Sequence, residues 1–325
     1  MNTSQKNINF SAYKYIVITP VFEDLASFTK LLKELTKVYK NNFLILAVDD
    51  GSITQPLSRE TLIKENVEGI VLKLKRNVGH QKAISIGMSH AAKFISNRHK
   101  ILIMDSDGED IPKSSKTLFE ALDEDFIDIA VAKRKNRIES NKFKIFYFFY
   151  KIFFRFLTGK NISFGNFMAL KPAALHRLLA MQELPTHIAA TVITSKLRLK
   201  FCSIDRGPRY EGSSKMNFVN LVLHGFKAIM IFTENVLIRT GIACGLIATF
   251  SILGIIAGVL LKTFGFATPG WFSIALGILV LIFLQTGAIT LISLLLTGVT
   301  KSQTETHETD YEKFIESVLL VLNKK

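Results

Sequence analysis

Short apolar runs alternate with helical patterns over the first 135 residues. The segments between the runs, such as LASFTKLLKELTKVY and HQKAISIGMSHAAKFI, have apolar residues at helical spacing. This alternation predicts an α/β fold in which a parallel sheet is covered by helices on both faces. We predict strands at residues 14–20, 43–50, 69–74, 100–107 and 126–132.

Two long stretches without charge follow, at residues 240–261 and 263–300. Each is long enough, at 1.5 Å per residue, to cross a hydrocarbon core of about 30 Å. The pattern predicts a hairpin of two transmembrane helices, with a turn at Pro269-Gly270 and an interfacial Trp271 between them. A small excess of basic residues beside the outer ends predicts that both face the cytoplasm. Buried core helices of a soluble protein are the alternative.

An aromatic segment at 141–160, NKFKIFYFFYKIFFRFLTGK, is too charged to span a membrane. Residues 133–160 contain nine basic residues and one acid. We expect a helix at the membrane surface, with rings inserted and Lys and Arg reaching lipid phosphates. A core helix packed on the sheet is the alternative. Residues 217–236 form a second candidate surface helix.

The resulting organisation has four parts. We predict a catalytic domain at 1–215 that includes the surface helix, a juxtamembrane helix at 216–238, a hairpin at 239–300 with helices at about 240–262 and 272–297, and a cytoplasmic tail at 301–325. The tail is polar and then amphipathic from 311 to 322, which predicts a short helix. The polar N-terminus has no apolar signal region, so we expect the first domain to remain in the cytoplasm.

Composition and charge narrow the class of protein. The 325 residues are 48% apolar and 21% charged, which excludes disordered and collagen-like chains. Residues up to Thr240 hold 36 of the 41 basic and 22 of the 27 acidic residues, which accounts for the whole net charge of +14. Nucleic acid, an anionic membrane surface and phosphorylated substrates could each explain this excess. The two cysteines, Cys202 and Cys244, do not indicate a disulfide framework.

The sequence Asp105-Ser106-Asp107 follows an apolar run. Carboxylates at a strand end can share Mg²⁺ or Mn²⁺ with a diphosphate, because these ions prefer oxygen ligands. An Asp-x-Asp sequence alone is common and usually forms a solvated loop. Its place after a strand, with a second acidic strand end at Asp49-Asp50, favours a ligand site.

Several motifs together resemble the family-2 glycosyltransferases of the GT-A fold. They are ITPVFED (18–24), VDDGS (48–52), RNVGHQKAISIGM (76–88), MDSDGEDIP (104–112), FGNFMAL (164–170) and RGPRYEGSSKMNF (206–218). The series and the hairpin are most similar to membrane-attached polyprenyl-phosphate glycosyltransferases, which include dolichyl-phosphate mannose synthases. The resemblance implies a bacterial inner-membrane enzyme of cell-envelope glycan synthesis. It leaves open whether the chain forms a homo-oligomer.

The resemblance also implies roles for individual residues. The implied catalytic residues are Asp105, Asp107 and Arg209, and the implied metal ligands for Mg²⁺ or Mn²⁺ are Asp105, Asp107 and Glu109. The implied binding residues for the nucleotide-sugar are Pro20, Phe22, Glu23, Asp50, Gly51, Ser52, Arg76, His80 and Asp105. The implied binding residues for acceptor or donor phosphates are Arg134, Arg137, Arg206, Arg209, Ser214 and Lys215.

Some positions depart from the family pattern. Asn166 stands where many relatives have Asp, and Asn cannot remove a proton. A polyprenyl phosphate is already anionic and needs little help to attack, whereas a sugar hydroxyl needs a general base. Asn166 therefore favours a phosphate acceptor. Gly108 and Glu109 replace the usual Leu-Gln, which bears on metal or donor preference.

The implied reaction is inverting transfer of a sugar from a nucleoside diphosphate-sugar to polyprenyl (undecaprenyl) phosphate at the cytoplasmic face of the membrane. A saccharide or lipid-linked glycan hydroxyl is the alternative acceptor. An inactive membrane scaffold is a third hypothesis, against which the intact Asp-x-Asp argues. A nucleic-acid-binding module is a fourth, but the basic residues cluster beside membrane-seeking aromatic residues instead.

Overall fold

The computed structural model describes residues 10–40, 42–134, 141–212, 218–266, 270–302 and 310–322. The chain separates into two compact units. The sheet unit comprises residues 1–139, 162–231 and 307–325, and the hairpin unit comprises residues 140–161 and 232–306. Each unit is described below by itself.

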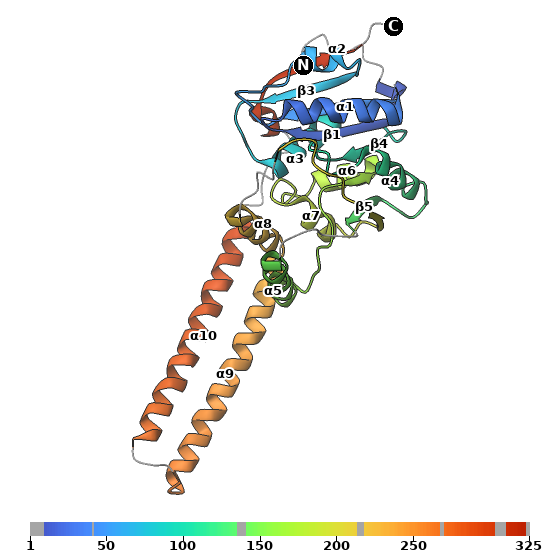
Figure 1. The fold of residues 1–325 in the computed structure, drawn as a ribbon. Helices are drawn as coiled ribbons and strands as arrows, with labels where there is room; N and C mark the ends of the chain where they lie inside the picture. Colours follow the sequence, from blue (N-terminus) through green and yellow to red (C-terminus); the bar gives the residue numbers. More distant parts are fainter. Residues whose placement is uncertain are drawn as a thin grey trace. The chain divides into compact units, whose positions relative to one another are not determined.

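The sheet unit is built on eight strands in the order β7-β5-β6-β4-β1-β2-β3-β8 (Figure 1). Strands β1 to β4 are parallel, as predicted, and β5 pairs in parallel with β7. Strands β6 and β8 run antiparallel to their neighbours, so the sheet is mixed. The strands are β1 (Tyr15–Val21), β2 (Phe43–Asp49), β3 (Gly69–Leu74), β4 (Lys100–Ile103), β5 (Ile129–Arg134), β6 (Met168–Leu170), β7 (Leu199–Ile204) and β8 (Ile315–Val321).

Successive residues of a strand point to opposite sides of the sheet. Both faces of this sheet carry apolar side chains, and helices cover both. On β1, Ile16 and Ile18 belong to one core cluster, and Val17 belongs to the other. The first cluster includes side chains of α3 (His80–Ala91), α6 (Pro172–Leu179) and α7 (Ile188–Thr194). The second includes side chains of α1 (Leu25–Tyr39), α2 (Arg59–Lys64) and α4 (Ser115–Ala121). The sheet unit also contains α8 (Phe218–Ile231), η2 (Phe10–Ala12), η3 (Pro112–Ser114) and η4 (Asp310–Phe314).

The C-terminal segment is a strand, so the helix that we predicted at 311–322 is wrong. Strand β8 pairs antiparallel with the outer edge of β3, from Gly69 opposite Val321 to Leu74 opposite Ile315. The segment IESVLLV is rich in Ile and Val, which favour strands. In this segment, hydrogen bonding to the open edge of the sheet outweighs the weak helical pattern. The tail therefore completes the sheet.

The hairpin unit contains α5 (Asn141–Thr158), α9 (Thr233–Thr263) and α10 (Trp271–Ser302). Helices α9 and α10 lie side by side (Figure 1). Both have windows long and apolar enough to cross a membrane, and only 11% and 6% of those windows is buried. Core helices of a soluble protein would be mostly buried, so this exposure is consistent with a transmembrane hairpin. Helix α9 begins at Thr233, before the start that we predicted near 240.

Helix α5 forms over the predicted surface segment and packs against α9. The rings of Phe154 and Phe232 meet edge to face at 5.8 Å, and Asn235 donates a hydrogen bond of 3.2 Å to the carbonyl of Thr158. The opposite face of α5 leaves large apolar side chains exposed, at Phe148, Ile152, Phe153 and Phe156.

We expect removal of the tail strand to destabilise the sheet unit. A chain that ends at residue 309 loses η4 and β8, and β3 loses the partner that pairs with its outer edge. We expect the free energy of unfolding to fall by about 2 kcal/mol or more. In a domain of this size a loss of about 2 kcal/mol lowers Tm by about 4–8 °C, so the midpoint of thermal unfolding should fall by roughly 5 °C or more. Hydrogen exchange at residues 69–74 should accelerate. A chain that ends at residue 322 keeps β8 and is the control; equal exchange at 69–74 in both chains would contradict this account.

Candidate active site

A cavity of about 810 Å³ opens at the carboxyl ends of β1 to β4. Its lining comes from the segments that directly follow these strands, at residues 20–24, Asp50, 77–82 and 105–107. The remaining wall comes from residues near Asn166, Pro185 and Arg209 and from α8, all within the sheet unit. Open α/β sheets bind ligands at this edge, so the position agrees with the motif analysis.

Asp50 joins two loops at the base of the cavity. Its carboxylate is 2% exposed and accepts hydrogen bonds from the backbone amides of Val78 at 2.7 Å and Gly79 at 3.0 Å. Burial raises the pKa of Asp50, although these two amides act against that shift. The hydrogen bonds tie the end of β2 to the loop that begins α3, and so fix the cavity wall between β2 and β3.

Glu23 organises the loop after β2 through its carboxylate. It accepts hydrogen bonds from the amides of Ile53 at 2.6 Å and Gln55 at 2.9 Å, and from both the amide and the hydroxyl of Thr54. These donors stabilise the charged form, and the side-chain bond from Thr54 contributes most to lowering the pKa of Glu23 to about 2. The amide of Glu23 in turn bonds the hydroxyl of Ser52 at 2.9 Å.

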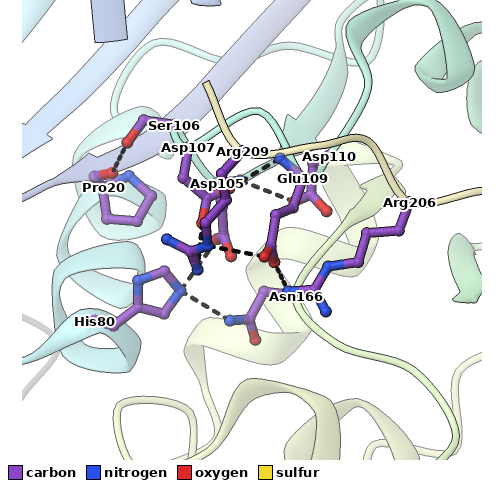
Figure 2. Close-up of polar contacts among 10 residues, drawn as sticks. All are labelled: Pro20, His80, Asp105, Ser106, Asp107, Glu109, Asp110, Asn166, Arg206 and Arg209. Carbon is purple, nitrogen blue, oxygen red and sulfur yellow. Dashed lines mark hydrogen bonds and ion pairs between the residues drawn. The ribbon is translucent and has the colours of Figure 1, made fainter. Parts of the chain in front are cut away.

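The Asp-x-Asp sequence lies in a loop that closes on itself after β4 (Figure 2). The amide of Asp105 donates to the carboxylate of Asp110 at 2.9 Å, and the amide of Glu109 donates to Asp107 at 3.0 Å. The hydroxyl of Ser106 donates to the carbonyl of Pro20 at 3.2 Å. This last bond holds the loop against the end of β1, so Asp105 and Asp107 line the cavity from a fixed backbone.

Two arginines about 100 residues away pair with this loop (Figure 2). Arg209 lies 2.9 Å from Asp107 and 2.9 Å from Glu109, and Arg206 forms an ion pair with the other oxygen of Glu109. Backbone bonds reinforce the contact, because the amide of Tyr210 donates to the carbonyl of Asp107 at 2.8 Å. The arginines bring positive charge beside a group of carboxylates that would otherwise repel one another.

His80 and Asn166 lie side by side at the cavity, joined by a hydrogen bond (Figure 2). Nε2 of His80 lies 3.1 Å from Asp105 and 3.0 Å from the amide nitrogen of Asn166. Desolvation by burial lowers the pKa of His80, but the carboxylates of Asp105, Asp110 and Asp107 together outweigh it and the pKa is raised overall. Asn166 therefore lies one hydrogen bond away from the Asp-x-Asp loop.

The structure brings most, but not all, of the sequence-predicted residues together. Those that line the cavity are Pro20, Phe22, Glu23, Asp50, His80, Asp105, Asp107 and Arg209. The described residues that do not line it are Gly51, Ser52, Arg76, Glu109 and Arg206. Arg206 forms an ion pair with Glu109, and the hydroxyl of Ser52 accepts a hydrogen bond from the amide of Glu23. Arg137, Ser214 and Lys215 lie outside the described residues, and Arg134 is described only through its backbone in β5.

Sequence reasoning missed several lining residues. Lys82 lies in the first turn of α3, and Leu223, His224 and Lys227 lie on α8. The ring of His224 stacks on that of His187 at 4.3 Å. Lys82 falls inside the matched motif RNVGHQKAISIGM and could have been found there; α8 carries no motif of its own, and only folding brings it to the cavity.

The donor set allows a divalent metal only with help from a substrate. Among the described residues, no group of three or more His, Cys, Asp or Glu side chains could hold an ion alone. Glu109 pairs with Arg206 and Arg209, and Asp107 also contacts Arg209, so the role of Glu109 as a third ligand stays a prediction. Two carboxylates completed by phosphate oxygens and water are the usual magnesium arrangement at phosphate sites. Asp105 and Asp107 fit that arrangement.

Comparisons with known proteins agree with this geometry. The family model for "Glycosyl transferase family 2" matches residues 16–179. The uncharacterized glycosyltransferase sll0501 of Synechocystis sp. is 27% identical over 275 residues and covers 82% of this chain and 82% of its own length. The uncharacterized glycosyltransferase YkcC of Bacillus subtilis is 24% identical over 277 residues, covering 80% of this chain and 81% of its own.

Solved structures share the fold at low identity. Glucosyl-3-phosphoglycerate synthase from Mycobacterium tuberculosis, solved with Mn²⁺, UDP-glucose and phosphoglyceric acid, has a TM-score of 0.50 and 10% identity over 70% of this chain and 80% of its own. A mycobacterial protein has a TM-score of 0.51 and 8% identity over 69% of this chain and 75% of its own. These similarities confirm the predicted GT-A class of the sheet unit.

We expect Gly108→Ala to disturb the Asp-x-Asp loop more than Gly212→Ala. Both glycines have positive φ, at +93° and +69°, so each substitution costs about 1 kcal/mol from the backbone alone. A Cβ at Gly108 would also lie 2.8 Å from the ring of Tyr210, whereas a Cβ at Gly212 meets no other atom of the described residues within 4 Å. Urea unfolding should show Gly108→Ala to be less stable by at least another 1 kcal/mol. Equal stability of the two variants would contradict the packing of Tyr210 on this loop.

Proposed function

The chain belongs to glycosyl transferase family 2, and we propose that it transfers a sugar from a nucleoside diphosphate-sugar to a polyprenyl phosphate such as undecaprenyl phosphate. It is a glycosyltransferase, and the proposal concerns its donor site, its metal and above all its acceptor. The observation that carries the acceptor is that Asn166, at the place of a base, and Lys227 of α8 line one cavity, while α8 also exposes an apolar stripe that begins at the cavity with Leu223.

The donor would occupy the part of the cavity between β1, β2 and β4. Pro20, Phe22 and Glu23 would border the base and ribose together with Asp50, as the family resemblance implies. Phe22 supports this role because its ring is 42% exposed at the cavity, where a base could stack on it. The diphosphate would lie toward Asp105 and Asp107.

Asp105 and Asp107 would hold Mg²⁺ or Mn²⁺ together with oxygens of the donor diphosphate. When bound, the ion offsets the negative charge that develops on the leaving nucleoside diphosphate. Arg209, which contacts Asp107, would lie beside the same phosphates. The Mn²⁺ and UDP-glucose bound by the mycobacterial synthase support a divalent ion and a nucleotide-sugar in this fold.

The acceptor end of the cavity favours an anion that needs no base. Asn166 cannot accept a proton from a hydroxyl. Among the other carboxylates of the described lining, Asp50, Glu23 and Asp24 accept hydrogen bonds from backbone amides, and Glu211 pairs with Lys30. A phosphate diester or monoester oxygen is ionised near pH 7, so it can attack without proton removal. It would attack the anomeric carbon opposite the bond to the leaving diphosphate, which inverts the configuration.

Helix α8 supplies both features that a lipid phosphate requires. Lys227 and His224 line the cavity one helical turn apart. Leu223, Phe226 and Met230 are 51%, 54% and 66% exposed at i, i+3 and i+7, so they form an apolar stripe along the same helix. A polyprenyl chain could lie along the stripe while its phosphate meets Lys227. A single residue, Phe232, separates the end of α8 from the start of α9.

The hairpin unit supports action at a membrane. Helices α9 and α10 expose apolar surface over most of their length, and α5 presents a second apolar stripe beside Lys151 and Arg155. We propose that the hairpin spans the bacterial inner membrane, that α5 lies at its surface and that the sheet unit is cytoplasmic. Arg134, Arg137, Arg206, Ser214 and Lys215 remain proposed contacts of donor or acceptor phosphates.

A hydroxyl acceptor is the second candidate function. His80 favours it, because an imidazole 3.0 Å from Asn166 and at the cavity could act as a base where relatives have Asp. This reaction would use a saccharide or lipid-linked glycan and would not need the cation on α8. The acceptor assay below separates the two functions.

We expect Asp107→Asn to abolish transfer with the fold intact. Asn keeps an oxygen to accept from the amide of Glu109 but loses the charge that holds a metal. The detergent-purified full chain would be incubated with undecaprenyl phosphate, Mn²⁺ and a panel of labelled nucleotide-sugars, with and without EDTA, and label in the lipid phase would be counted. Asp123→Asn removes an exposed carboxylate paired with Lys100 and is the control. Turnover of Asp107→Asn at the wild-type rate would contradict the metal assignment.

We expect Lys227→Gln to weaken use of the lipid phosphate selectively. Loss of one charged hydrogen bond at a partly exposed site should raise the KM for undecaprenyl phosphate roughly tenfold. The KM for the donor should not change. Lys33→Gln removes an exposed lysine from α1, outside the cavity lining, and serves as the matched control. Transfer to a saccharide and none to lipid phosphate would instead favour the hydroxyl acceptor.

A further inference from the structure

The segment after the hairpin reaches the rim of the donor end of the cavity. Strand β8 and η4 pack along β3 and α3, the elements that lead into and out of the loop at 77–82. Lys93, two residues beyond the end of α3, pairs with Glu312 and lies 5.3 Å above the ring of Tyr311. The segment is therefore attached to α3 as well as to the sheet.

Phe314 is the residue of this segment whose ring contacts a cavity-lining side chain, that of Lys82. Its carbonyl accepts a hydrogen bond of 2.9 Å from the amide of Lys75, and its side chain packs on the core cluster beneath α3. Nζ of Lys82 lies 3.9 Å from the centre of its ring, and the guanidinium of Arg76 lies 6.0 Å from it. A partly buried ring packed on the core thus has a cavity-lining cation close to its face.

This contact restricts a side chain that is otherwise long and mobile. A cation within about 6 Å of an aromatic ring is attracted by the negative face of the ring. Lys82 is half-buried, so part of its water is already removed and the attraction is stronger than at a fully exposed site. The ring therefore restricts the ammonium to conformations beside the start of α3, where His80 lies 3.1 Å from Asp105.

The charge of the cavity shows what this cation could bind. The donor end is rich in carboxylates, at Glu23, Asp50, Asp105 and Asp107. The lysines and arginines among the described lining residues are Lys82, Arg209 and Lys227. Arg209 lies beside Asp107 and Glu109, Lys227 lies on α8, and Lys82 lies at the start of α3. It also lies in the first turn of α3, where the helix dipole favours an anion.

We propose that Lys82 binds the phosphates of the nucleoside diphosphate part of the donor, and that Phe314 is a positioning residue that holds Lys82 for this contact. The inference deepens the proposed function, since it rests on a nucleotide-sugar donor. It gives the C-terminal segment a role in substrate binding besides completing the sheet.

The test measures nucleotide binding by the full chain in detergent, using isothermal titration calorimetry with UDP, GDP and dTDP. We expect Phe314→Leu, which keeps apolar volume but removes the ring, to raise the Kd of the best nucleotide roughly three- to tenfold. Lys82→Gln should raise it by at least as much, and the double variant should be no weaker than Lys82→Gln alone. In the transfer assay, Phe314→Leu should raise the donor KM and leave kcat unchanged.

Two further variants separate positioning from general damage to the segment. Phe314→Tyr keeps an aromatic face and should restore wild-type affinity. Tyr311→Leu removes the matched ring under Lys93, which does not line the cavity, and should leave the Kd unchanged. Equal Kd values for Phe314→Leu and wild type, an unchanged Kd for Lys82→Gln, or an equal loss in Tyr311→Leu would each overturn the inference. Failure of the wild type to bind any of the nucleotides would overturn the proposed donor class itself, and the inference with it.

Discussion

Ion pairs between the loop after β4 and the segment after β7 hold the candidate site together. Asp107 and Glu109 lie beside carboxylates at 105 and 110, and this concentration of negative charge is unfavourable without compensation. Arg206 and Arg209 supply it from about 100 residues away in the sequence. Partly buried pairs of this kind add little net stability, but breaking one leaves an uncompensated charge. The pairs therefore fix where the segment at 206–210 must lie.

The consequences extend beyond these residues. With Arg209 beside Asp107, the amides of Gly207 and Tyr210 donate hydrogen bonds to the carbonyls of Glu109 and Asp107. Residues 211 and 212, which follow, line the cavity. Helix α8 then forms one wall, with Lys227 and His224 at the cavity and an apolar stripe beside them. Burial lowers the pKa of both stacked histidines, that of His187 to about 3, so Lys227 carries the positive charge of this wall near neutral pH.

The sheet unit also depends on residues from both ends of the chain. The hairpin sequence separates β8 from the rest of the sheet unit, yet β8 covers the outer edge of β3. An uncovered edge would expose unpaired backbone groups to other chains. The same pairing brings Phe314 beside Lys82 and Tyr311 beside Lys93. The segment that covers the edge of β3 therefore also contacts a residue at the donor end of the cavity.

The sequence by itself determined the parts governed by local pattern. Strands β1 to β4, the acidic residues at their ends, the aromatic helix at 141–158 and the two long apolar helices follow from periodicity, because each period specifies its own element. The tertiary structure decided what depends on partners distant in the sequence. It made residues 315–321 a strand, because an open sheet edge was available, and it paired Arg206 with Glu109 rather than placing both at the cavity. It also brought Lys82, His224 and Lys227 to one cavity, because pairing and packing across the sheet set distances that no local pattern encodes.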